Sequence, residues 1–311
     1  MLPTHNDVHE DKILTNICTA YRSTDWIWDM VFPVVDTGGT LSDKYYTFTK
    51  GDWLRNDAEV LAPGDPAPIS GFRVSTDSFS CNEYGIAAQM PKQTLENADA
   101  PLQQSLLNQQ GIWCTDTINR KMEVDLATTI FTTSVWGTDN TSATDWDDFD
   151  SSTPIDDVIG GADTIQGNTG KDPNTLIIGQ QVWSKLKRNP EILSVLGANE
   201  RGAVTADMLA NFLEVDRLLV GRAVYNTANE AQTASLSRAW GKNALLLYVT
   251  PQPGIMTPTA GYTFRAHPLR IYTWYEDNAT HKELYFVRAT ISQGYKVVGS
   301  DLGYFFSSVV S

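Results

Sequence analysis

A single long helix is the feature that most constrains this sequence. Asn97 or Asp99 can cap it, and Pro101 stands in the first turn, where proline is tolerated. From Leu102 to Val135 such a helix is roughly 50 Å long, about the diameter of a compact globule of this chain length. The rest of the fold must therefore be arranged along it. Its apolar residues recur mostly three, four or five positions apart: Leu102, Leu106, Trp113, Ile118, Met122, Leu126 and Ile130.

Two features limit the regularity of this helix. Gly111 costs about 1 kcal/mol in a helix interior, which predicts a bend or a close contact there. Threonines are frequent after Ala127, and their branched side chains lower helix propensity. We therefore expect the regular part to end near Ala127, inside a wider spine of about 97–135.

The chain before the helix offers apolar side chains but no core of its own. After a polar start, residues 26–33 are rich in tryptophan and other apolar residues, which must pack on the rest of the chain or on a neighbour. Gly38-Gly39 indicates a hinge, and residues 45–48 and 69–74 read as the two strands of a hairpin. Because isolated hairpins are marginal in water, this one either lies on its own domain or docks on another subunit.

The chain after the helix predicts a mixed sheet and then a closing hairpin. Between about 154 and 260, short helices alternate with buried strands such as 176–178, 217–224 and 244–249, which is typical of an α/β unit. Residues 269–275 and 283–291 bracket a turn-forming Asp-Asn-Ala-Thr and predict an antiparallel pair. The fold class expected is therefore α+β, or mixed α/β.

Composition excludes several classes of protein. The 311 residues carry a net charge of −14, and no basic cluster suggests a grip on nucleic-acid phosphates. Three widely spaced cysteines predict neither a disulfide framework nor a zinc site. The longest apolar run, 244–249, is far too short to cross a bilayer, so we expect no membrane partner.

No motif for catalysis or cofactor binding is present. The chain lacks a Gly-x-Ser-x-Gly elbow, a Walker loop and a dinucleotide-binding Gly-x-Gly-x-x-Gly. The carboxylates of 145–150 lack the glycine and distal glutamate of a calcium loop. We therefore expect no enzyme activity, catalytic residue, cofactor or metal. An acidic soluble hydrolase is a distant alternative, supported only by the surplus of carboxylates and aromatic residues.

The order of these parts resembles one known family. Four stretches carry the resemblance: Asn174-Thr-Leu-Ile-Ile-Gly-Gln-Gln-Val-Trp-Ser-Lys-Leu, Val215-Asp-Arg-Leu-Leu-Val-Gly-Arg-Ala-Val-Tyr-Asn, Trp240-Gly-Lys-Asn-Ala-Leu-Leu-Leu-Tyr-Val and Gly303-Tyr-Phe-Phe. Together with the arm, the hairpin, the long helix and the closing strands, they resemble the major capsid protein of tailed bacteriophages, with its Hong Kong 97-like fold. Nearly the whole chain takes part in the resemblance.

The resemblance implies a division into four parts. Residues 1–36 would form the N-arm, and residues 37–75 the extended β-hairpin loop. Residues 76–150 and 262–300 would form the peripheral domain around the spine helix. Residues 151–261 and 301–311 would form the α/β axial domain, whose tips meet at the centre of hexamers and pentamers.

The resemblance also implies partners and a place in the virion. Copies of the chain would form an icosahedral phage head, assembled in the host cytoplasm around double-stranded DNA, with a separate scaffolding protein, a portal and a possible decoration protein. An encapsulin-type compartment with the same fold is the nearer alternative. Apolar and cationic residues of the arm and the loop are the predicted subunit interface: Trp26, Trp28, Phe32, Tyr45, Phe48, Trp53, Leu54, Arg55 and Phe72.

Overall fold

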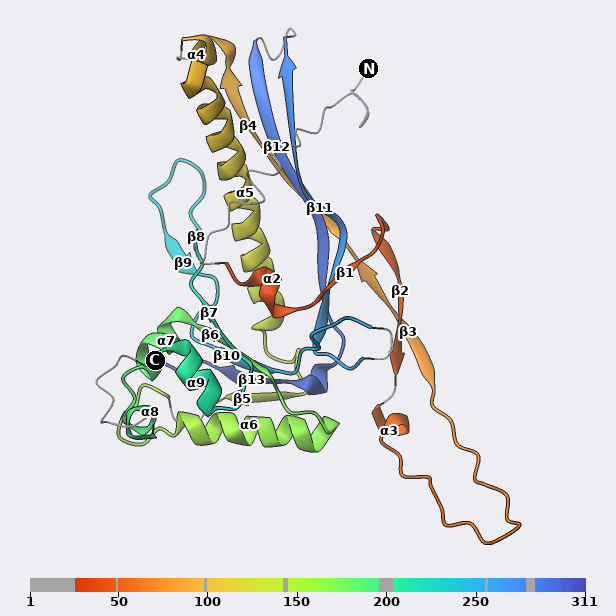
Figure 1. The fold of residues 1–311 in the computed structure, drawn as a ribbon. Coiled ribbons are helices and arrows are strands. Elements are labelled where there is room, and N and C mark those ends of the chain that lie inside the picture. The colour runs from red at the N-terminus through yellow and green to blue at the C-terminus, as the bar shows by residue number, and fades with distance from the viewer. Residues whose placement is uncertain are drawn as a thin grey trace.

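The structure, a computed structural model, describes residues 26–48, 50–97, 100–141, 145–195, 204–254, 257–277 and 283–311. One long helix, α5 (Ala100–Ile130), stands beside a sheet of long strands, and a second sheet lies beyond the C-terminal end of the helix (Figure 1). A long loop projects on the other side of the first sheet. The fold is thus mixed α and β, as predicted. The expected N-arm falls mainly on residues 1–25, which lie outside the described residues.

The predicted spine helix is present and unbroken. It continues through Gly111 and ends at Ile130, three residues beyond the predicted end of its regular part but short of Val135, the predicted limit of the spine. The threonines do not stop it, and their hydroxyl groups donate to carbonyls one turn back, as Thr128 does to Val124 at 2.7 Å. Ile130 is fully buried, so tertiary packing extends the helix past the point that propensity predicts.

The first sheet packs against this helix. Its strand order is β1 (Val34–Asp36), β11 (Gly261–Glu276), β12 (Leu284–Val297) and β4 (Asn82–Pro91). The predicted closing hairpin is confirmed as the antiparallel pair β11–β12, although both strands are longer than predicted. The buried face of α5 lies on β12 and β4, with Cys114, Ile118, Met122 and Leu126 in the core.

The second sheet is assembled from distant parts of the chain. Its order is β5 (Thr138–Thr141), β13 (Gly303–Ser307), β10 (Ala244–Leu247), β6 (Thr175–Gly179) and β7 (Arg217–Gly221). Helices α6 (Pro154–Thr169), α7 (Gln180–Leu186), α8 (Pro190–Val195) and α9 (Ala206–Phe212) belong to the same unit. Trp146, fully buried, lies in its core.

Two of the predicted domain boundaries need correction. Residues 138–150 were assigned to the peripheral domain, but β5 pairs with β13 and Trp146 packs in the core of the second sheet. The predicted loop ended at residue 75, whereas its return strand β3 (Val74–Ser80) continues to Ser80. Both errors arise because the deciding contacts are long-range pairings that local sequence does not encode.

Gly303 occupies a position with no room for a side chain. A Cβ there would lie 2.1 Å from the ring of Trp136, which is buried and donates its Nε1 hydrogen to the Ile130 carbonyl at 2.7 Å. We expect Gly303→Ala to lower the free energy of unfolding by about 2–3 kcal/mol, measured by urea denaturation. Gly160→Ala in α6 is the control, since its Cβ would meet no atom within 4 Å and should stabilise the helix by about 0.5–1 kcal/mol. Similar effects of the two substitutions would contradict this account of Gly303.

Candidate functional site

A two-stranded ribbon anchors the projecting loop to the first sheet. Strand β2 (Ser42–Phe48) pairs antiparallel with β3. The ribbon is held by aromatic packing, with the rings of Phe79 and Phe264 stacked 4.2 Å apart. It is also held by Asp77, which accepts a hydrogen bond from Tyr45 at 2.9 Å and pairs with Lys296 at 3.0 Å. The hydrogen bond from Lys296 is the main reason that the pKa of Asp77 lies below its usual value.

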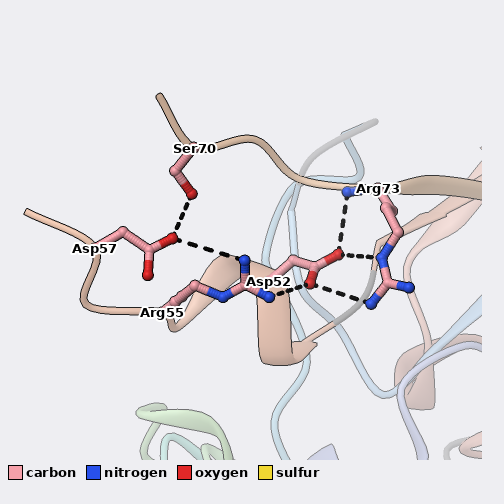
Figure 2. A network of polar contacts seen from close by, with 5 residues as sticks. All are labelled: Asp52, Arg55, Asp57, Ser70 and Arg73. Atoms are coloured by element: carbon pink, nitrogen blue, oxygen red, sulfur yellow. Dashed lines mark hydrogen bonds and ion pairs between the residues drawn. The ribbon is translucent and has the colours of Figure 1, made fainter. Parts of the chain in front are cut away.

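Beyond the ribbon, one carboxylate organises the base of the loop. Asp52, in α3 (Lys50–Trp53), is paired with Arg73 through Nε at 2.8 Å and with Arg55 at 3.1 Å (Figure 2). The hydrogen bonds from Arg73 hold the pKa of Asp52 below its usual value. Asp57 continues this network to Arg55 at 3.7 Å and to the hydroxyl of Ser70. These contacts tie the outgoing limb of the loop to the returning limb.

The loop carries apolar side chains that are exposed in the part of the subunit that the structure describes. The Trp53 and Phe72 rings meet edge to face at 5.5 Å between centroids, yet they remain 55% and 46% exposed. Leu54, Val60 and Ile69 are also exposed, the last two completely. The two limbs border an open hollow of about 730 Å³, and Trp53, Leu61 and Phe72 are among the residues that line it. Several exposed apolar side chains on one projecting loop are typical of a protein–protein contact.

The predicted interface residues differ in where the structure places them. Trp53, Leu54, Arg55 and Phe72 lie together on the exposed loop, and Tyr45 is half-buried in its ribbon. Trp28 and Phe32 are only 8% and 2% exposed, since they pack in the core of their own subunit, and we correct the prediction for these two. Trp26 is half-buried, with Arg120 5.9 Å from its ring. The side chain of Phe48 lies outside the described residues.

Sequence reasoning missed two exposed loop residues and one buried carboxylate. Val60 and Ile69 follow no helix or strand period, and their only signal is that they are apolar within a segment rich in Pro and Gly. Glu123 is fully buried on the inner face of α5. The only sign in the sequence is that this charged residue directly follows Met122, which belongs to the apolar stripe of the helix.

Glu123 joins three parts of the subunit. Its carboxylate accepts backbone hydrogen bonds from Ile27 at 3.1 Å and Trp28 at 2.8 Å, at the start of α2 (Trp28–Val31). It also accepts a hydrogen bond from Nε1 of Trp240 at 2.5 Å, from the segment that leads into β10. The spine helix is thereby bonded both to the base of the arm and to the unit of the second sheet.

Burial raises the pKa of Glu123 to about 7, although the hydrogen bonds from Trp240, Trp28 and Ile27 act in the opposite direction. Since the ordinary value is 4.5, the folded state retains a proton that the unfolded state loses as pH rises. Protonation of Glu123 therefore stabilises the fold most below about pH 4.5, and this contribution, about 3 kcal/mol, is lost as pH rises through about 7.

Between pH 5 and 8 we expect the free energy of unfolding of wild type to fall relative to that of Glu123→Gln, because the glutamine side chain cannot titrate. Urea denaturation of both proteins across that range gives the difference. Asp29, Tyr295 and Arg265 are charged or titratable groups near this site and are common to both proteins. Parallel pH profiles of the two proteins would contradict the assignment of this pH dependence to Glu123.

Neither a metal cluster nor a membrane span is found among the residues that the structure describes. Among them, no group of three or more His, Cys, Asp or Glu residues is placed to hold a metal ion. None of the helices described is both long and apolar enough for a membrane span. The features that stand out are therefore contact surfaces and anchoring bonds.

Comparison with known proteins places these features in context. No family model matches the chain. The major capsid protein of Burkholderia phage BcepMu is 26% identical over 313 residues, covering 96% of each protein. The major capsid protein of Pseudomonas phage JBD67 is also 26% identical, over 76% of each protein.

Solved structures share the whole fold. A phage-related protein of Bordetella bronchiseptica matches with a TM-score of 0.73 at 21% identity, covering 97% of this chain and 98% of its own. The capsid of Myoviridae phage XM1 matches with a TM-score of 0.57 at 10% identity, covering 93% and 94%. The predicted resemblance to phage capsid proteins and their Hong Kong 97-like fold is confirmed.

Proposed function

We propose that this chain is the major capsid protein of a tailed phage, a structural subunit that assembles with copies of itself into the hexamers and pentamers of an icosahedral head. The projecting loop is the observation that carries the proposal. Its base is held by the ion pairs of Asp52 with Arg73 and Arg55, and its apolar side chains are exposed in the part of the subunit that the structure describes. Two relatives, which match 96% and 76% of this chain, are phage major capsid proteins, which supports the same role and a place in the virion.

The parts of the fold suggest separate tasks in such a shell. Of the predicted arm, residues 1–36, the part from 26 to 36 packs on its own subunit, so only the part before it would lie along a neighbour. The loop would overlap the adjacent subunit. The first sheet and α5 would form the peripheral domain, and the second sheet with its helices the axial domain. A scaffolding protein, a portal and a decoration protein are further proposed partners. The net charge of −14 suits a container that holds double-stranded DNA without gripping its phosphates.

Electron microscopy of the purified protein, alone and with a scaffolding protein from neighbouring genes, tests the proposal. We expect shells, tubes or isolated capsomers. Persistent monomers under every condition would overturn it. Shells that copurify with a cargo enzyme, and genes without a portal or terminase nearby, would instead favour the encapsulin-type compartment.

A further inference from the structure

We infer that the loop of one subunit docks on the β8–β9 ribbon of the next subunit in a head-to-tail ring. This ribbon comprises β8 (Val224–Asn226) and β9 (Leu236–Arg238), which pair antiparallel. The inference rests on the proposed function, because it needs a second copy of the chain. It adds the acceptor surface and the chemistry that selects it.

The ribbon has one covered face and one open face. Tyr225 and Ser237 are half-buried on the face where β8 lies against α5. The opposite face carries Val224 and Leu236, and Leu236 is 71% exposed. Directly opposed residues of an antiparallel pair share a face, so Arg238 stands beside Val224 on this open side. The result is a small apolar surface with a cation at its edge.

A second cation borders the same surface. Arg222 is exposed, two residues before Val224 in the chain, and Arg238 is exposed at the end of β9. Among the residues that the structure describes, neither has an ion-pair partner within the subunit. Glu230 lies in the turn at the far end of the ribbon, so the basic end is the end nearest the second sheet.

The projecting loop has the complementary pattern. Val60 and Leu61 are exposed between Glu59 and Asp65. Within the described residues these two carboxylates have no cation partner, whereas Arg55 and Arg73 are already paired with Asp52. The charges without an ion-pair partner are therefore negative on this limb and positive on the ribbon. On both surfaces they lie beside apolar side chains. Such complementarity selects partner and register.

The positions of the two surfaces fit a ring. The loop and the β8–β9 ribbon lie on opposite sides of the subunit, with α5 and the first sheet between them (Figure 1). A subunit with complementary patches on opposite sides cannot satisfy both patches in a two-fold dimer. It forms a heterologous contact that repeats from copy to copy and closes when the rotation allows.

Disulfide capture in assembled particles tests the inference. Val60→Cys with Leu236→Cys is made in a Cys18→Ser background, while the native Cys81 and Cys114 are buried. After mild oxidation, non-reducing gels should show covalent rings of five and six chains. The control pair, Val60→Cys with Leu193→Cys in α8, should remain monomeric. Dimers alone, or equal capture by the control pair, would overturn the inference.

Charge exchange provides a second test without cysteines. Arg222→Glu with Arg238→Glu should reduce the yield of particles about tenfold or more, because like charges then face each other. Adding Glu59→Arg and Asp65→Arg should restore it. If wild-type particles form but neither the rescue nor the rings appear, the docking inference fails and the proposed function stands. If wild-type particles never form, the proposed function fails first.

Discussion

Replacing residues 56–70 with a three-residue Gly-Ser-Gly linker should abolish particle formation while leaving the fold of the subunit intact. Within this segment only Asp57 is partly buried, so its removal changes the free energy of unfolding by less than about 1 kcal/mol. The ends can be joined, since the Trp53 and Phe72 rings are 5.5 Å apart and Asp52 bonds to Arg73. Assembly should fail, because the replacement removes the same apolar surface from every contact between subunits around a ring.

Sedimentation velocity measures the assembly of this loop variant, and urea denaturation its stability. Val60→Ser with Ile69→Ser is the matched control for loop length, since it retains the backbone and removes two fully exposed apolar side chains. It should weaken the affinity of each subunit contact about tenfold, so its assembly should be intermediate between that of wild type and that of the deletion variant. A deletion variant that unfolds would place the loop in the core, and one that assembles normally would remove the loop from the interface.

The elements that sequence predicted best are those with local signals. Regular apolar spacing predicts α5, and a turn-forming tetrapeptide predicts the β11–β12 hairpin. The membership of the second sheet has no local signal, because β13 pairs with β10 and, in parallel, with β5 more than 160 residues earlier. Only tertiary packing decides which strand lies beside which.

The candidate site shows the same limit at the level of single residues. Trp53 and Phe72 were predicted because aromatic side chains in a segment without a core need a partner. The same argument failed for Trp28 and Phe32, since an aromatic ring suits a core and an interface equally well. Glu123 could not be predicted, because its three donors come from distant parts of the chain that meet only in the folded subunit.

Glu123→Ala should lower the free energy of unfolding by about 3 kcal/mol. It removes the acceptor shared by the amides of Ile27 and Trp28 and by Nε1 of Trp240. Each buried donor left without a partner costs about 1–3 kcal/mol, and relief from burying the carboxylate offsets part of the sum. The loss should be smaller for Glu123→Gln, whose amide oxygen still accepts a hydrogen bond.

Urea denaturation measures how much stability Glu123→Ala loses, and hydrogen exchange shows which part of the subunit is affected. Asp125→Ala is the matched control, because Asp125 lies on the same helix and pairs with Lys121 at 2.7 Å near the surface, where such pairs contribute about 0.5 kcal/mol. In Glu123→Ala the amides of Ile27 and Trp28 should exchange faster than in wild type, whereas in Asp125→Ala they should not. Equal losses of stability in the two variants, or unchanged exchange at the base of the arm, would mean that Glu123 does not bond the arm to the spine. Without that bond, α2 would still be held by the packing of Trp28, Val31 and Phe32 and by the hydrogen bond from Arg217 to the Met30 carbonyl at 3.0 Å.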